Sequence, residues 1–202
     1  MIKHIVFDFG DVFINLNKMA THKALSQYAC KASLSEINHF NQLYETGKLT
    51  TKAFTDFYLR SFKDLTPSLF KTAWNQILQD IPNHRLRFIQ ALYNDNQFEL
   101  ILLSNTNELH IDFIKNNEPN YTDFKCCFHG FYLSYLINMR KPNKDIFLHI
   151  QQKHQINPNE ALFIDDLPEN IATAQQLGYQ TWLLDRAKED VTELFNIKAD
   201  LF

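Results

Sequence analysis

Side chains able to do chemistry stand directly after short apolar segments of this 202-residue chain, or next to a proline. They are Asp8, the pair Ser104 and Asn105, Lys141 in the run Arg140-Lys141-Pro142, and the adjacent carboxylates Asp165 and Asp166. If the apolar segments are strands of one parallel sheet, these groups meet at its carboxyl edge, where open α/β sheets bind their ligands. The set would combine three or, with Asp11, four carboxylates, one hydroxyl and one ammonium group.

This combination of groups indicates phosphoryl chemistry assisted by a metal ion. Grouped carboxylates repel one another, and one must be protonated unless a cation lies among them. Oxygen ligands on rigid strand ends suit Mg²⁺ better than zinc. Mg²⁺, a lysine and a serine hydroxyl together can hold a phosphoryl group, and an aspartate that points at it can attack phosphorus as a covalent nucleophile. We therefore expect Mg²⁺ as cofactor and a small phosphate ester as substrate.

The spacing of apolar residues predicts the elements that would position these groups. Runs rich in Ile, Leu, Val and Phe, typical of strands buried on both faces, lie at 5–9, 98–103, 161–164 and 181–184, with a weaker candidate at 127–133. Helical spacing or helix signals occur at 83–93, 107–116, 144–154 and 168–177. This alternation predicts an α/β fold, namely a Rossmann-like parallel sheet with helices on both faces.

Residues 15–82 interrupt the alternation and look helical throughout. Ser33 begins a capping-box sequence, and Thr66 precedes a proline that suits a first helical turn. The sequence therefore predicts a small all-helical cap domain at 15–82, inserted after the first strand of a core domain formed by 1–14 and 83–202.

Composition excludes several classes of protein. The chain has only 4 glycines and neither glycine-rich phosphate-binding motif, so any phosphate site must be built another way. A net charge of −3 argues against nucleic-acid and anionic-membrane partners, and no apolar run approaches the roughly 18 residues of a membrane helix. The 3 cysteines lack C-x-x-C spacing and there is no signal-peptide pattern, so we expect a cytoplasmic protein, as a monomer or weak homodimer.

The order of these motifs resembles the haloacid dehalogenase (HAD) superfamily of hydrolases. The resemblance lies in Phe7-Asp8-Phe9-Gly10-Asp11-Val12, Leu103-Ser104-Asn105-Thr106-Asn107, Arg140-Lys141-Pro142 and Phe163-Ile164-Asp165-Asp166. It covers nearly the whole chain, and the helical insert is similar to the small helical cap of this family. The second and third motifs, with Tyr132-Leu133-Ser134, are most similar to the bacterial sugar-phosphatase branch, which includes alpha-D-glucose-1-phosphate phosphatase.

The resemblance implies a role for each matched residue. These roles are nucleophile and Mg²⁺ ligand for Asp8, phosphate binding for Ser104 and Asn105, pairing with the phosphoryl group and Asp8 for Lys141, and Mg²⁺ binding for Asp165, Asp166 and the backbone carbonyl of Gly10. The protein would then be a Mg²⁺-dependent phosphatase of a small phosphorylated metabolite, such as a sugar phosphate, working through an aspartyl-phosphate. The cap would close over the substrate and exclude water.

Gly10 departs from the family pattern. Family phosphatases usually have a second aspartate here, which protonates the leaving group and then activates water. Three readings stay open: a phosphatase that works without this acid, one in which Asp11 or a cap residue supplies the proton, and a dehalogenase or catalytically weak binding protein. Losing the acid–base group would cost on the order of 10²–10⁴-fold in rate. The acidic pair Asp165-Asp166 favours a metal-dependent phosphatase, since the family's dehalogenases need no Mg²⁺.

Overall fold

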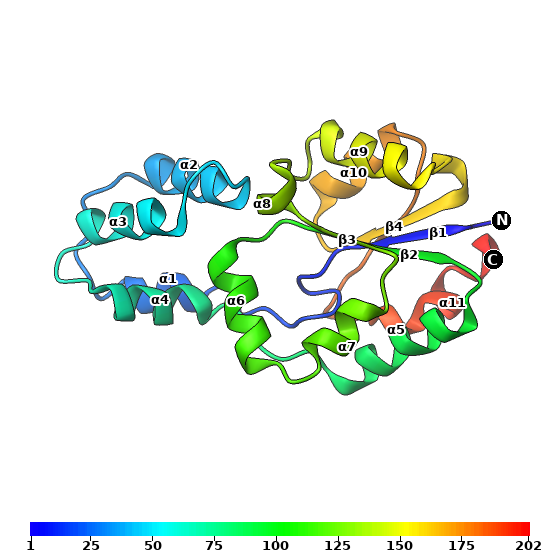
Figure 1. Cartoon of the computed structure of the whole chain (residues 1–202), viewed down its shortest axis with the longest axis horizontal. Coiled ribbons are helices and arrows are strands. Elements are labelled where there is room, and N and C mark those ends of the chain that lie inside the picture. The colour runs from blue at the N-terminus through cyan, green and yellow to red at the C-terminus, as the bar shows by residue number, and fades with distance from the viewer.

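A five-stranded, all-parallel sheet lies at the centre of the larger of two lobes in the computed structural model, which describes residues 1–202 (Figure 1). Its strands are β1 (His4–Phe7), β2 (Glu99–Ser104), β3 (Gly130–Leu133), β4 (Ala161–Asp165) and β5 (Gln180–Leu183). They lie in the order β3-β2-β1-β4-β5, so β1 is central and is flanked by β2 and β4. The predicted parallel α/β fold is confirmed, and the three strands that end at the candidate site are neighbours.

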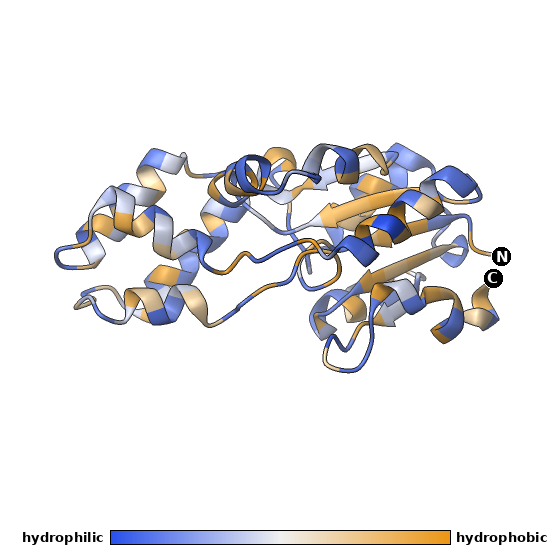
Figure 2. Cartoon of the chain, turned by 90° about the horizontal axis from the view of Figure 1, so that it is seen from below, coloured by the Kyte–Doolittle hydropathy of each residue, from blue (hydrophilic) through white to orange (hydrophobic).

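Helices cover both faces of the sheet. On one face lie α9 (Lys144–His154) and α10 (Pro168–Gln176), and on the other lie α5 (Asn83–Asp95), α6 (Glu108–Asn117), α7 (Tyr121–Cys126) and α11 (Leu194–Ile197). Alternate residues of each strand serve the two layers: Ile5 and Phe7 belong to one apolar cluster and Val6 to the other. The central strands are therefore apolar along most of their length (Figure 2), as strands buried on both faces must be.

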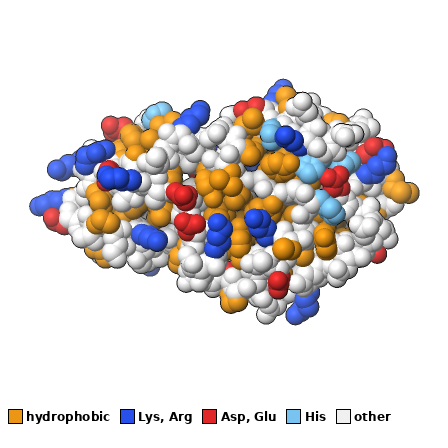
Figure 3. All heavy atoms as spheres, viewed as in Figure 1, with side chains coloured by type: hydrophobic (Ala, Val, Ile, Leu, Met, Phe, Trp, Pro, Cys, Tyr) orange, Lys and Arg blue, Asp and Glu red, His pale blue; other side chains and the backbone are white.

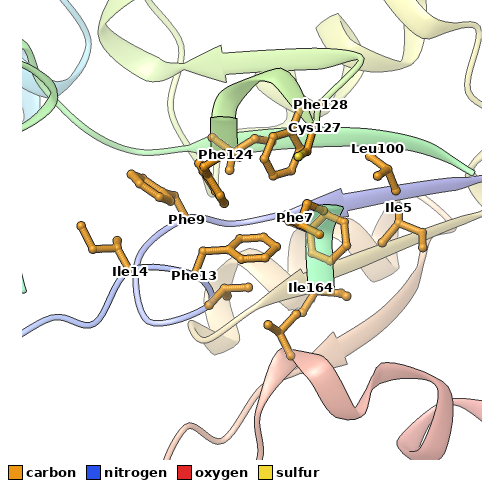
Figure 4. Packing of buried hydrophobic residues seen from close by; sticks show 14 of the residues in the cluster. Ile5, Phe7, Phe9, Phe13, Ile14, Leu100, Phe124, Cys127, Phe128 and Ile164 are labelled. Atoms are coloured by element: carbon orange, nitrogen blue, oxygen red, sulfur yellow. The ribbon is translucent and has the colours of Figure 1, made fainter. Parts of the chain in front are cut away.

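Aromatic rings fix the loop that follows β1. The ring centroid of Phe13 lies 5.2 Å from that of Phe7 and 5.1 Å from that of Phe124 on α7, and Phe128 completes the group (Figure 4). All four rings are buried, and burying one phenylalanine side chain stabilises a fold by about 1.5–3 kcal/mol. The segment that carries Asp8 is thereby held against the core.

The four helices between β1 and α5 form a second lobe, called here the helical unit. They are α1 (Ala20–Leu25), α2 (Leu34–Glu45), α3 (Thr51–Ser61) and α4 (Pro67–Asn75). The unit has its own aromatic core, in which Phe54 stacks on Tyr44 with centroids 4.0 Å apart and contacts Trp74 at 5.0 Å. Ser33 and Thr66 cap α2 and α4, as their spacing predicts.

Two extended segments join the helical unit to the sheet lobe, and their backbones pair with each other. The amide of Asn15 donates to the carbonyl of Asp80 at 3.0 Å, and that of Asn17 donates to the carbonyl of Ile77 at 2.8 Å. This pairing is called here the linker ladder. The prediction that residues 15–82 are helical throughout is therefore wrong at both ends, because these main-chain groups are satisfied across the ladder instead of within a helix.

The remaining elements are short. They are α8 (Ser134–Ile137), which follows β3 directly, and 3₁₀ helices at Pro158–Glu160, Val191–Glu193 and Ala199–Leu201. No helix combines the length and the apolar character that crossing a membrane would require. On the face shown in Figure 3, acidic and basic side chains are interspersed and no extended basic patch is present, in keeping with the net charge of −3.

Candidate functional site

A pocket of about 230 Å³ lies between the carboxyl edge of the sheet and the helical unit. The sequence-predicted site residues that line it are Asp8, Gly10, Ser104, Asn105, Lys141 and Asp166. They come from the ends of β1, β2 and β4 and from the segment before α9. Asp165, the last residue of β4, is completely buried and bonded to Lys141. The structure therefore brings every predicted site residue to one place.

The ammonium group of Lys141 lies between two carboxylates. Its Nζ donates to Oδ1 of Asp8 and to Oδ2 of Asp165, both at 2.7 Å, and the three side chains are 1%, 12% and 0% exposed. Burial raises the pKa of the Asp8 carboxyl to about 7, against the lowering effect of Lys141. Burial also works to lower the pKa of Lys141, but Asp165 and Asp8 raise it above its usual value. The lysine is therefore charged and paired, as a buried cation must be.

Asp165 is held in place by the chain that turns into α10. The side-chain amide of Asn170 donates to both of its carboxylate oxygens at 2.9 Å, and the backbone N–H of Leu167 donates to Oδ1 at 2.8 Å. Together with the bond from Lys141, these contacts engage both oxygens of Asp165. Its carboxylate thus fixes the position of the lysine.

Three carboxylates lie close enough together to bind one metal ion. One oxygen from each of Asp8, Asp165 and Asp166 lies within 4.8 Å of the other two. The nearby carbonyl of Gly10 accepts no hydrogen bond within the protein. Asp166 pairs with Lys18 at 2.6 Å, and burial raises the pKa of this carboxyl. An all-oxygen donor set of this kind fits Mg²⁺.

The end of β2 presents free donors to the pocket. The hydroxyl of Ser104 and the backbone N–H of Asn105 make no hydrogen bond within the protein. The Asn105 side chain is engaged elsewhere: its Nδ2 donates to the carbonyl of Lys141 at 2.8 Å, and its Oδ1 accepts from the Lys141 amide at 2.9 Å. This restricts the predicted phosphate binding by Asn105 to its backbone N–H, because its side chain positions Lys141.

Asp11 does not line the pocket. Its backbone is left-handed, with φ of +57°, and its buried carboxylate pairs with Arg186 and, at 3.0 Å, with Lys18. The backbone amide of Leu16 donates to it at 3.0 Å. The structure therefore argues against the reading in which Asp11 protonates the leaving group, since its oxygens bind cations behind the pocket wall.

The helical unit contributes one wall of the pocket through Glu45, at the end of α2. Oε2 of Glu45 pairs with Nη2 of Arg140 at 3.1 Å, and its backbone carbonyl accepts from Oγ of Ser134 at 2.6 Å. His110 on α6 lines the same pocket and stacks on Trp74 of α4, with centroids 5.3 Å apart. The motifs do not mark His110, which is apparent only once α4 and α6 are placed side by side.

Gly47 allows the helical unit to dock closely on α8. Its φ is +65°, and a Cβ at this position would lie 2.1 Å from the backbone oxygen of Tyr135. We expect the Gly47→Ala change to lower the free energy of unfolding by at least about 1 kcal/mol and to raise KM, because the turn that carries Glu45 must move. Thermal unfolding and steady-state kinetics measure the two effects.

Gly178 provides a matched control for this docking effect. It also has a positive φ, +92°, but the nearest atom to its missing Cβ lies 3.5 Å away, at ordinary contact distance. The Gly178→Ala change should therefore cost stability through backbone strain alone and leave KM unchanged. An equal rise of KM in both variants would show that Gly47 has no special role in docking.

Residues 2–178 match the sequence model of the haloacid dehalogenase-like hydrolase family. The chain belongs to this family. It is similar to a D-ribitol-5-phosphate phosphatase of Bacteroides thetaiotaomicron, with 27% identity over 214 residues that cover 97% of this chain and 100% of the relative. It is also similar to an HAD family enzyme from the same organism solved as a magnesium complex, with 30% identity and a TM-score of 0.85 over 96% of this chain and 98% of that chain.

These comparisons confirm the family predicted from the motifs. The same HAD enzyme was also solved in complex with magnesium and inorganic phosphate. A 2-haloacid dehalogenase from Pseudomonas syringae has a TM-score of 0.62 over 100% of both chains, but only 16% identity. That likeness shows the HAD fold and does not bear on the reaction of this chain.

Proposed function

We propose that this HAD-family hydrolase is a Mg²⁺-dependent phosphatase that acts on a small sugar or sugar-alcohol phosphate through an aspartyl-phosphate. The proposal rests on the position of the Lys141 ammonium group. Its Nζ lies 2.7 Å from a carboxylate oxygen of Asp8 and from one of Asp165, and the free hydroxyl of Ser104 lines the same pocket. A fixed cation and free donors around one carboxylate suit the binding of a phosphoryl group within reach of a nucleophile. One relative is named as a phosphatase, and another was solved with magnesium and phosphate, which supports this assignment.

Each of these groups has a defined part in the proposed reaction. Asp8 attacks phosphorus, while Lys141 and the Ser104 hydroxyl bind the phosphoryl oxygens on which charge is greatest. The backbone N–H of Asn105 is a third donor to the same oxygens. Because these groups are already fixed by the protein, they need little reorganisation when the transition state forms.

Asp8, Asp166 and the Gly10 carbonyl are the groups we assign to Mg²⁺. Asp165 acts through Lys141 in this assignment, because the lysine, Asn170 and the Leu167 amide already engage both of its oxygens. A magnesium ion bound there would offset the negative charge of the phosphoryl group as Asp8 approaches it.

The lining of the pocket supports a hydroxyl-rich carbon chain as the leaving group. Its lining combines polar side chains, namely Glu45, Asn107, His110 and Arg140, with apolar ones, namely Ile14, Leu16, Ile77, Leu78 and Ile114. A sugar or sugar alcohol offers both hydroxyls for such polar groups and carbon–hydrogen edges for such apolar ones. The volume of about 230 Å³ suits a small substrate.

Removal of the metal tests the proposed function against the dehalogenase alternative. We expect purified protein with Mg²⁺ to hydrolyse sugar and sugar-alcohol phosphates, with D-ribitol 5-phosphate and glucose 1-phosphate in the panel, and EDTA to abolish the reaction. Added Mg²⁺ should restore it, because three clustered carboxylates need a cation beside a dianionic substrate. Metal-independent turnover, or release of halide from 2-haloacids in EDTA, would contradict the proposal.

A further inference from the structure

We propose that Glu45 is the acid–base residue of this site and handles the proton that no side chain at Gly10 can carry. This role rests on the phosphatase function proposed above. In an in-line displacement, the attacking and leaving oxygens lie on opposite sides of phosphorus. With Asp8 at the sheet edge, the leaving group therefore lies toward the wall that the helical unit supplies, and Glu45 is on that wall.

Most ionisable side chains of the pocket have other partners or roles. Besides Glu45, the ionisable lining residues are Asp8, Lys18, His110, Arg140, Lys141 and Asp166. Asp8 and Lys141 form the phosphoryl site, and Lys18 pairs with Asp166. Arg140 keeps its proton at any relevant pH. His110 and Glu45 are the two that remain.

His110 is not available for proton exchange with a substrate, because both of its ring nitrogens are bonded within the protein. Its Nε2 lies 3.2 Å from the backbone oxygen of Trp74, which can only accept, so Nε2 carries the hydrogen. Its Nδ1 lies 3.1 Å from Nδ2 of Asn107, which donates to it, because Oδ1 of Asn107 accepts from the His110 amide. Burial lowers the pKa of His110 to about 4. The ring is therefore neutral with both nitrogens occupied.

Glu45 is fixed but keeps one oxygen free. Its backbone is held by Ser134 at 2.6 Å and its Oε2 by Arg140 at 3.1 Å, whereas its Oε1 makes no hydrogen bond within the protein. Burial raises the pKa of this carboxyl and Arg140 opposes the rise, with a net upward shift. Glu45 can thus carry a proton, and Arg140 stabilises the carboxylate that remains once the proton has left.

Both half-reactions balance with this residue. Asp8 Oδ forms a bond to phosphorus, the bond from phosphorus to the leaving oxygen breaks, and that oxygen takes the proton of Glu45. A water then attacks phosphorus and gives one proton to the Glu45 carboxylate as the bond between phosphorus and Asp8 breaks. Phosphate leaves, and both carboxyl groups return to their starting states.

The Glu45→Gln variant tests this role, because it keeps the shape of the side chain and removes the proton. Turnover of an alkyl phosphate such as D-ribitol 5-phosphate should fall about 10²–10⁴-fold. 4-Nitrophenyl phosphate has a leaving group that needs no proton, so the variant should release nitrophenolate in a rapid burst and then turn over slowly. Glu45→Asp should retain part of the activity on the alkyl ester.

Asn138→Gly is the control for Glu45→Gln, because it tests the effect of loosening the contact between the Glu45 turn and the sheet lobe. Asn138 donates to the carbonyl of Thr46 at 2.9 Å from a left-handed conformation that glycine tolerates. This change loosens the same turn without touching the carboxylate, so it should lower turnover of both esters by the same factor and give no burst. Absence of a nitrophenolate burst in Glu45→Gln, or unchanged turnover of the alkyl ester, would overturn the acid–base role. Absence of any Mg²⁺-dependent activity in the unaltered protein would instead overturn the phosphatase proposal itself.

Discussion

The Asp8→Asn variant should lose phosphatase activity by at least about 10⁴-fold while it keeps its fold. An amide cannot form the phosphoaspartate, so the two-step route through a covalent intermediate is closed. Stability should not fall, because Asn has the shape of Asp and Lys141 keeps Asp165 as its partner. The change also removes a carboxylate whose burial is unfavourable, as the raised pKa of Asp8 indicates. Steady-state assays with Mg²⁺ and thermal unfolding measure the two effects.

Asp56→Asn is the control for this variant. Asp56 lies on α3 in the helical unit, where it is 40% exposed and pairs only with Lys52. Its loss should leave turnover and unfolding temperature close to those of the unaltered protein. Wild-type turnover in Asp8→Asn would rule out Asp8 as the nucleophile, and a phosphorylated Asp8 trapped by acid quench in the unaltered protein would identify it directly.

The Lys141→Met variant should lose both activity and stability. Methionine leaves Asp8 and Asp165 buried without their shared cation, and breaking a buried ion pair in this way costs about 3–5 kcal/mol. Turnover should fall by at least about 10²–10³-fold, because a preorganised charge on the phosphoryl oxygens is lost. Mg²⁺ should raise the unfolding temperature of this variant more than that of the unaltered protein, since it is then the one cation left among these carboxylates.

Lys144→Met separates these effects from a general loss of positive charge. Lys144 begins α9 only three residues along the chain, yet it is exposed and forms no ion pair. It should show neither the stability loss nor the added response to Mg²⁺. A Lys141→Met protein as stable as the Lys144→Met protein would mean that the buried carboxylates do not need the lysine.

The sheet and the residues gathered at the candidate site could be predicted because both depend on local sequence. A strand buried on both faces must be apolar along its length, so the segments around Val6, Ile101 and Phe163 stand out. Neighbouring parallel strands end at the same edge of the sheet. Asp8, Ser104 and the acidic pair that ends the β4 segment were therefore expected to meet there. No knowledge of the packing was needed for either step.

The partners of individual polar side chains could not be predicted in the same way. Asn105 bonds to the backbone of Lys141, and Asp11 pairs with Arg186, across long stretches of sequence. The linker ladder likewise joins two segments that are separated along the chain by the whole helical unit. Periodicity shows which face of an element is buried, but a contact of this kind depends on how two elements approach each other.

Because of the linker ladder, the two segments that connect the lobes form one two-stranded ribbon and are not independent of each other. Each strand restrains the other, so any movement of the helical unit relative to the sheet lobe must bend or twist the ribbon as one piece. One strand of that ribbon continues directly from the loop of Asp8 and Gly10, which the rings of Phe13 and Phe124 clamp to the core. Release of product from a covered site often limits turnover. In this protein the ribbon that joins the lobes and the loop that carries the proposed nucleophile are parts of one continuous piece of chain.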